Sequence, residues 1–254
     1  MDMPVNELKR ALLAGKTQVG CWLSLGSHAA AEICASAGFD WVLIDTEHAP
    51  VDIPQVHHQL QAVAAYPVSA LVRAYWNDTV LIKRLLDLGV QSLLLPYVQS
   101  AEEAKRAVAA VRYPPRGVRG VSANSRSNRF GRVQDYFEHA DNEVCLMVQV
   151  ETRQAIAQID AMAAIDGIDV IFIGPQDLAA DFGHLGNPAH PEVQAAMGEA
   201  IARIRKAGKI AGILAFAEAD AKRWISQGAQ FVAVTSDQFL LSRSSDAVVK
   251  AFRG

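Results

Sequence analysis

The sequence predicts a single (β/α)8 barrel that spans residues 1–254. Short apolar runs of the length of buried parallel strands alternate with longer stretches of helical period, which is typical of a wound α/β fold. Eight such runs are present, and no Pro-rich or Gly-rich linker divides them. This arrangement favours a closed barrel, although an open doubly wound sheet fits the same alternation.

The predicted strands cover residues 18–23, 41–45, 69–72, 92–95, 144–150, 170–173, 210–214 and 231–234. The amphipathic stretches between them predict helices over 29–37, 53–64, 77–88, 101–111, 192–207 and 219–227. Asn77 and Ser100 are predicted N-caps, and several helices end at a glycine suited to a C-cap, namely Gly38, Gly89, Gly208 and Gly228. A further helix over 5–14 is expected to close the bottom of the barrel, where the strands begin.

Two segments interrupt this alternation. Residues 113–136 are too many for an ordinary connection and are rich in Arg, Ser, Asn and Gly. They form either a solvated excursion or a loop over an active site. Residues 174–188 place glycines and prolines around a short helical piece after the sixth strand.

Composition excludes several classes of protein. The formal net charge is −3 with Lys and Arg scattered along the chain, so no nucleic-acid partner is expected. No apolar run approaches the roughly 20 residues that span a bilayer, and the N-terminus lacks the apolar core of a signal peptide. We therefore expect a cytoplasmic protein without a membrane partner. Cys21, Cys34 and Cys145 are widely spaced in apolar segments, which predicts buried thiols.

Reactive groups of (β/α)8 barrels gather at the C-terminal ends of the strands, which surround the mouth. Polar residues that end the predicted apolar runs are therefore the candidates for chemistry. They are Asp45, Thr46, Glu47 and His48 after the second strand, Arg73 after the third, Gln149 and Glu151 at the fifth, and Gln176 and Asp177 after the sixth.

Glu151 and Asp177 follow different strands and are predicted to converge at the mouth as two oxygen ligands of a divalent cation. Such a site, with positions left for water and substrate, suits Mg²⁺, Mn²⁺ or Co²⁺. Each carboxylate alone also fits a first-turn residue stabilised by a helix dipole. The two together, with Gln149 beside them, favour the metal site.

His48 is the one histidine that directly follows a predicted strand, where an imidazole is suited to carry protons. Asp45, three residues earlier, is a secondary member of the site. Arg73 fits two roles: it pairs with a carboxylate of the rim, or its planar fork binds a substrate carboxylate or a developing enolate oxygen.

The predicted strand ends lack the residues that two other kinds of mechanism require. No lysine ends a predicted strand at the mouth, and Lys209 precedes a strand at the opposite end, which disfavours a Schiff base. No GxGxxG or Walker-type loop follows a strand, so no nucleotide cofactor is expected.

Six segments resemble the HpcH/HpaI aldolase family, and the resemblance runs over nearly the whole chain. They are FDWVLIDTEHAP (39–50), VRAYWNDTVLIKRLLDLGVQSLLLPYVQS (72–100), YPPRGVRGVS (113–122), VQVET (148–152), IFIGPQDLAADFGHLGNPAHPEVQ (171–194) and AQFVAVTSD (229–237). The resemblance implies a class II aldolase that uses a divalent metal and reversibly cleaves a 4-hydroxy-2-oxo acid to pyruvate and an aldehyde. It also implies a homohexamer of two trimers in which neighbouring subunits exchange the last helix, about 237–252.

Carried over residue by residue, the resemblance implies that His48 is the catalytic histidine and that Asp87 increases its basicity. Arg73 would stabilise the enolate, and Glu151 and Asp177 would hold the metal. The keto acid would be contacted by Gln149, Gly174, Pro175 and Gln176.

Two positions depart from the family pattern. Thr46 stands where the family's IDGEH motif has glycine, and Gln176 stands where members commonly carry Ala or Ser. Both changes leave the predicted metal and base positions intact, so they bear on substrate and rate. The aldehyde is not determined by the sequence: succinic semialdehyde, tartronate semialdehyde and lactaldehyde all fit.

Two other functions fit the same residues. A citryl- or malyl-CoA lyase of the same barrel group would use similar carboxylates, and only the 116–132 segment offers a basic cluster for its nucleotide. A barrel that binds keto acids without catalysis is the other alternative.

Overall fold

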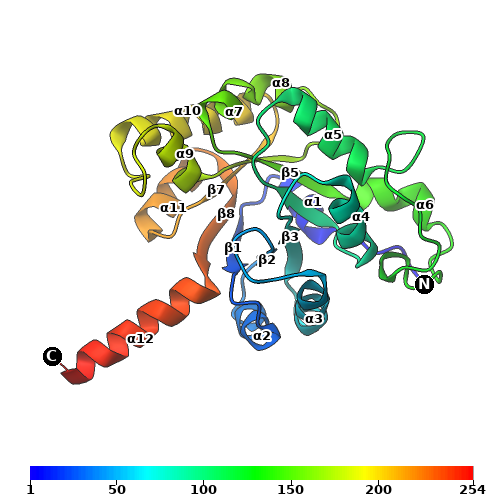
Figure 1. The fold of residues 1–254 in the computed structure, drawn as a ribbon, viewed down its shortest axis with the longest axis horizontal. Coiled ribbons are helices and arrows are strands. Elements are labelled where there is room, and N and C mark those ends of the chain that lie inside the picture. Colours follow the sequence, from blue (N-terminus) through cyan, green and yellow to red (C-terminus); the bar gives the residue numbers. More distant parts are fainter. Residues whose placement is uncertain (254) are drawn as a thin grey trace.

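A computed structural model describes residues 1–253 and contains a closed barrel of eight parallel strands (Figure 1). The strands pair in chain order, and β8 (Ala229–Ser236) closes the barrel by pairing with β1 (Gln18–Leu23). This confirms the predicted barrel and excludes the open sheet. Gly254, the last residue of the predicted domain, lies outside the described residues.

The predicted elements are all present, with ends within two residues of those expected. The remaining strands are β2 (Trp41–Asp45), β3 (Ser69–Arg73), β4 (Ser92–Leu95), β5 (Cys145–Val150), β6 (Val170–Ile173) and β7 (Ile210–Leu214). The helices are α1 (Glu7–Leu13), α2 (His28–Ser36), α3 (Ile53–Val63), α4 (Thr79–Asp87), α5 (Ala101–Val111), α6 (Tyr136–His139), α7 (Arg153–Ala157), α8 (Ile159–Ala163), α9 (Pro175–Asp181), α10 (Pro191–Lys206), α11 (Glu218–Ser226) and α12 (Asp237–Arg253).

One predicted helix cap is wrong. The carboxylate of Asp78, rather than the amide of Asn77, caps α4 by accepting a hydrogen bond from Leu81 N at 2.8 Å. Asn77 instead donates from Nδ2 to the carbonyl of Glu103. Both side chains are good caps, and only the backbone path decides which one reaches the third helical residue. The predicted cap at Ser100 is confirmed, and the four predicted C-cap glycines all have positive φ.

The core has two layers because side chains alternate across each strand. Along β2, Val42 and Ile44 face the helices, whereas Trp41 and Leu43 fill the barrel interior. Trp41 stacks on Phe231 of β8 with ring centroids 4.1 Å apart. The predicted buried thiols are confirmed, since all three cysteines are free and buried.

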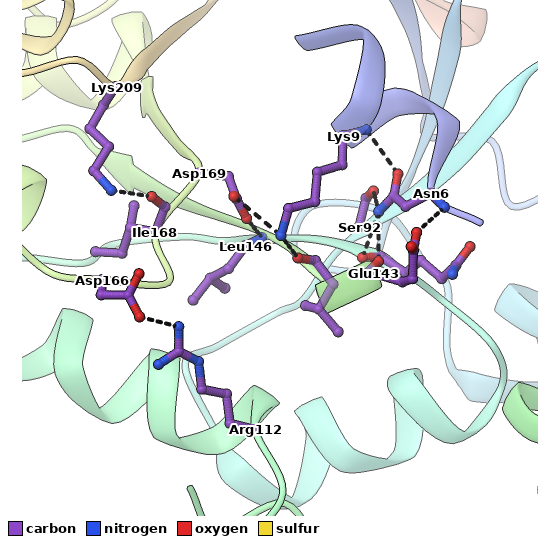
Figure 2. Close-up of polar contacts among 12 residues, drawn as sticks. Asn6, Lys9, Ser92, Arg112, Glu143, Leu146, Asp166, Ile168, Asp169 and Lys209 are labelled. Carbon is purple, nitrogen blue, oxygen red and sulfur yellow. Dashed lines mark hydrogen bonds and ion pairs between the residues drawn. The ribbon is translucent and has the colours of Figure 1, made fainter. Parts of the chain in front are cut away.

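The N-terminal helix α1 covers the bottom of the barrel, as the sequence predicts. Leu8 and Leu12 join the apolar cluster of the barrel interior. Asn6 donates from Nδ2 to Ser92 Oγ at 2.9 Å, and Lys9 donates to the carbonyl of Val144 and pairs with Asp169 at 3.3 Å (Figure 2). These contacts fasten α1 to the starts of β4, β5 and β6.

The long segment 113–136 also lies toward the bottom of the barrel. Arg126 donates from Nη1 to the carbonyl of Leu88, at the turn that leads into β4. Arg119 is only 1% exposed and its guanidinium stacks over the ring of Tyr113. The segment is therefore not a loop over the mouth of its own barrel.

The last helix, α12, leaves the barrel instead of covering it. Figure 1 shows it extending away from the end of β8, and its side chains from Leu240 onward are exposed. Within residues 1–253, no helix is both long and apolar enough to cross a membrane.

Gly20 of β1 is predicted to be essential for packing of the barrel interior. A Cβ added there would lie 2.0–2.4 Å from three ring atoms of Trp41, which is fully buried. We expect Gly20→Ala to lower the free energy of unfolding by about 1–3 kcal/mol because the core is overpacked. Urea denaturation measures this change.

The matched control is Gly198→Ala in α10, where an added Cβ meets its nearest atom at 3.5 Å. That substitution should leave stability unchanged or raise it by up to about 1 kcal/mol, because alanine favours the helix. Equal stability of the two variants would contradict the packing argument.

Candidate active site

The predicted site residues converge on a cavity of about 640 Å³ at the C-terminal ends of the strands. Eight of them line it, contributed by β2 and the turn after it, β3, β5, and Gly174 with the first turn of α9: Asp45, His48, Arg73, Gln149, Gly174, Pro175, Gln176 and Asp177. Glu151 lies in contact with this wall and is 2% exposed. The cavity is completed by residues that were not predicted, among them Trp22, Gln194, Phe216 and Asp220.

Arg73 is held by two carboxylates, one at the end of the neighbouring strand β2 and one in the turn that follows it. Asp45 and Arg73 are register partners of β2 and β3, and Arg73 donates from Nε and Nη2 to the two oxygens of Asp45 at 2.9 and 2.7 Å. Its Nη1 lies 2.8 Å from Glu47 Oε2. Burial lowers the pKa of Arg73, but bonding to Asp45 and the charges of Asp45 and Glu47 outweigh it and raise the pKa.

This pairing is the rim ion pair that the sequence allowed for Arg73. Arg73 also lines the cavity, because Asp45 binds only one edge of its guanidinium group. Pairing and substrate contact therefore do not exclude each other.

Thr46 fastens the chain after β2 to β3. Its backbone N–H and its hydroxyl both donate to the carbonyl oxygen of Arg73, at 3.1 and 2.7 Å. The hydroxyl supplies a contact that a glycine at this position lacks. Thr46 thus fixes the start of the turn that carries His48, which is exposed and lines the cavity.

Glu151 is a buried carboxylate with two hydrogen-bond donors. Its Oε1 accepts from Tyr97 N at 2.7 Å, and its Oε2 accepts from Gln149 Nε2 at 2.5 Å. A Cβ added at Gly174 would lie 2.4 Å from Glu151 Oε2, so only glycine leaves this oxygen free on the side of β6. The carboxylate is therefore oriented by three neighbouring elements.

Negative charge accumulates at the mouth. Burial raises the pKa of Glu151 to about 7, and the charge of Asp177 contributes, although the hydrogen bonds from Gln149 and Tyr97 oppose the shift. Burial also raises the pKa of Glu47, against the attraction of Arg73. In both residues burial has the largest effect on the pKa, and the neighbouring carboxylates add to it.

The residues fit a divalent cation on two grounds. Glu151 and Asp177 are close enough for the charge of one to raise the pKa of the other. In addition, Gln149 Oε1 is buried beside Glu151 without a hydrogen-bond partner among the described residues. Carboxylate and amide oxygen atoms are the donors that Mg²⁺ and Mn²⁺ prefer.

Asp87 is the one predicted site residue that the fold does not bring to the mouth of its own barrel. It ends α4 at the bottom, where its Oδ1 lies 3.7 Å from Nη2 of Arg119. Burial raises the pKa of Asp87, and the charge of Arg119 opposes this. An action of Asp87 on His48 within one chain has no geometric basis, so any such action requires a second copy.

Glu47 is a site residue that the sequence analysis did not assign. It stood among the polar residues after the second strand, but nothing in the pattern distinguished it from an ordinary exposed loop carboxylate. Its side chain is 18% exposed and shares Arg73 with Asp45. The sequence feature that could have identified Glu47 is its position next to His48, shortly after the end of a strand.

Comparison with known proteins agrees with this geometry. Residues 18–244 match the HpcH/HpaI aldolase/citrate lyase family. A protein from Rhizobium etli named pyruvate aldolase is 58% identical over 99% of both chains. A 4-hydroxy-2-oxo-heptane-1,7-dioate aldolase from Klebsiella pneumoniae is 54% identical over 97% of this chain and 94% of that protein.

A solved structure has the same fold over nearly its whole length. The HpcH/HpaI aldolase/citrate lyase family protein from Burkholderia cenocepacia superposes with a TM-score of 0.95 at 38% identity, over 98% of this chain and 100% of that one. The match of sequence and fold along the entire barrel shows that this chain belongs to the HpcH/HpaI aldolase/citrate lyase family.

Proposed function

We propose that the protein is a divalent-metal-dependent pyruvate aldolase, which reversibly cleaves a 4-hydroxy-2-oxo acid to pyruvate and an aldehyde. The observation that carries this proposal is that His48, Arg73 and Asp177 line one cavity, with the buried carboxylate of Glu151 hydrogen-bonded to Gln149 of its wall. Relatives that are 54–58% identical are named pyruvate aldolase and 4-hydroxy-2-oxo-heptane-1,7-dioate aldolase. The enzyme is therefore a carbon–carbon lyase.

The metal ligands in this proposal are Glu151 and Asp177. A divalent cation held there would supply Lewis acidity, which would polarise the keto group of pyruvate and acidify its methyl protons. Gln149 keeps Glu151 oriented by its hydrogen bond, and the backbone at Gly174 leaves room beside the carboxylate. With Pro175 and Gln176, these residues form the wall against which the keto acid binds.

Arg73 offsets the negative charge that develops on the oxygen of the enolate. Asp45 already orients the guanidinium group, so Arg73 does not have to move when the charge develops. Asp45 acts through Arg73 and is a positioning residue. Glu47 has a similar positioning role, because its carboxylate lies beside Nη1 of the same guanidinium.

His48 carries the proton of the hydroxyl group in the cleavage direction. It lines the cavity and is exposed, so it exchanges protons both with the 4-hydroxyl of the substrate and with bulk water. In the direction of synthesis it returns this proton to the aldehyde oxygen as the new bond forms.

The structure weakens the CoA-thioester alternative. A CoA lyase needs cationic side chains near its substrate cavity for the nucleotide, and the one basic cluster in the sequence belongs to residues 116–132. That segment packs at the bottom of the barrel, where Arg126 contacts Leu88. The cavity wall itself carries Arg73 as its guanidinium.

The proposed assembly is a homohexamer in which α12 is exchanged between subunits. Its apolar side chains Leu241, Val248 and Phe252 are between 59% and 87% exposed in the single chain, and exchange would bury them. An assembly also offers Asp87 a route to His48 of a neighbouring copy. The cytoplasmic location stays a prediction.

Removal of metal is the first test of the function. Dialysis against EDTA should abolish release of pyruvate from a 4-hydroxy-2-oxo acid, and Mn²⁺, Co²⁺ or Mg²⁺ should restore it. A coupled assay for pyruvate measures both steps. Activity that survives chelation, or inactivation by borohydride with pyruvate, would point to a Schiff base and overturn the proposal.

The same samples separate an aldolase from a barrel that only binds keto acids. With metal present, NMR in D2O should show exchange of the methyl protons of pyruvate. Binding of pyruvate without exchange would favour the non-catalytic alternative.

The affinity for Mn²⁺ should depend on the protonation of Glu151. Because its pKa in the metal-free protein is raised to about 7, the carboxyl group is protonated below that pH and a proton competes with the metal. We expect affinity to fall about tenfold per pH unit below pH 7 and to level off above it. Calorimetric titration from pH 5.5 to 8 measures this dependence.

Glu151→Gln is the control for this titration, since it removes the proton-binding group and should bind Mn²⁺ weakly with little dependence on pH in this window. Equal affinities of the unmodified protein at pH 5.5 and 7.5 would contradict the role of Glu151.

Substitutions of His48 and Arg73 test their roles in turnover. We expect His48→Ala to lower kcat by at least about 100-fold with the fold retained. Arg73→Lys keeps a charge beside Asp45 but loses the fork, and should lower kcat/KM by at least about 100-fold. Arg73→Ala is less informative, because it leaves Asp45 buried without its partner. Near-normal rates in either variant remove that residue from the mechanism.

A further inference from the structure

A second group of side chains of the types that bind metals lies in the connection between α9 and α10 and in the first turn of α10 (Figure 1). His184, His190 and Glu192 each offer one ligand atom, and these three atoms all lie within 4.8 Å of one another. The group shares no residue with the carboxylates of the barrel mouth. Imidazole and carboxylate together are the ligands of open zinc sites, in which water completes the coordination.

The backbone of this connection brings the two histidines together. His184 N donates to the carbonyl of Ala179 at 2.7 Å, Asn187 N donates to His184 O at 2.9 Å, and His190 N donates to Asn187 O at 3.1 Å. Gly186 has a φ of 74°, which allows the chain to reverse between the histidines. The loop is thus closed by its own hydrogen bonds, and His184 returns over the start of α10.

One of the ligand distances is close to that around a tetrahedral ion, whereas the stacked histidine rings have to rearrange. His184 Nε2 lies 3.0 Å from Glu192 Oε2, and ligand atoms bound at about 2.0–2.1 Å around tetrahedral zinc lie roughly 3.3 Å apart. The rings of His184 and His190 are stacked with centroids 3.4 Å apart and planes 17° apart. A metal lies in the plane of each imidazole that it binds, so the His190 ring must rotate out of the stack to bind one. This rotation breaks the hydrogen bond that His190 Nδ1 accepts from Glu192 N, which is long at 3.3 Å.

We infer that His184, His190 and Glu192 form a second metal site, which takes Zn²⁺ or Co²⁺ and braces the rim of the substrate cavity. Two imidazoles favour these ions over Mg²⁺, whose preferred ligands are oxygen atoms. The site reaches the rim because Pro188 and Ala189, between the two histidines, line the cavity. The inference concerns a site separate from the mouth carboxylates and does not depend on the proposed activity.

Titration with Co²⁺ distinguishes the two sites, because four-coordinate Co²⁺ with nitrogen ligands absorbs visible light far more strongly than six-coordinate Co²⁺ in oxygen sites. The chelator-treated protein with Glu151→Gln, which disables the mouth site, is the starting material. His190→Asn removes one imidazole but keeps an N-cap acceptor for α10. His58→Asn is the matched control, because it removes an exposed histidine of α3.

We expect one strongly absorbing Co²⁺ per chain in the starting protein and in His58→Asn, displaced by Zn²⁺ but not by Mg²⁺. His184→Asn and His190→Asn should each weaken Co²⁺ binding by at least about 100-fold. This loss is larger than that expected from removing a residue that only hydrogen-bonds to a metal ligand. Zn²⁺ should also slow proteolytic cleavage at Leu185, which is 85% exposed, in the starting protein and in His58→Asn but not in His184→Asn or His190→Asn. Equal Co²⁺ affinity in His190→Asn and His58→Asn, or no strong absorption in the starting protein, overturns the inference.

Discussion

The burial of acidic side chains at one end of the barrel is the constraint on which the active site depends. Asp45 and Glu151 are both 2% exposed, and a buried carboxylate is costly unless it is paired or hydrogen-bonded. Asp45 has the guanidinium of Arg73, whereas Glu151 has only a backbone N–H and an amide. Burial, with a contribution from the charge of Asp177, raises the pKa of Glu151, and a cation at this place would offset that cost.

The two ends of the barrel use the same residue types for different purposes. At the bottom, Asp169 is paired with Lys9 and accepts from Leu146 N, and this network fastens the N-terminal helix to the strands. At the mouth, carboxylates outnumber their partners. The ion pairs at the bottom therefore stabilise the fold, whereas the unpaired carboxylates around the cavity do not add to its stability.

The single chain leaves two features without an intramolecular purpose. Helix α12 stands away from the barrel with Leu241 and Phe252 exposed, and the segment 113–136 with the buried Arg119 lies far from its own mouth. The proposed assembly would account for α12, because exposed apolar helices are stabilised by burial against another copy. The proposed role of Asp87 depends on the same assembly.

The sequence by itself determined the barrel, because eight apolar runs with the period of buried strands have few other ways to be covered. It also determined which side chains reach the mouth, since a strand end fixes the place of residues such as Asp45, Arg73 and Asp177. Only the tertiary structure decided that Glu47 shares Arg73, that Asp78 caps α4 and that Asp87 lies at the opposite end. These outcomes depend on distances between segments far apart in the chain, which local periodicity does not encode.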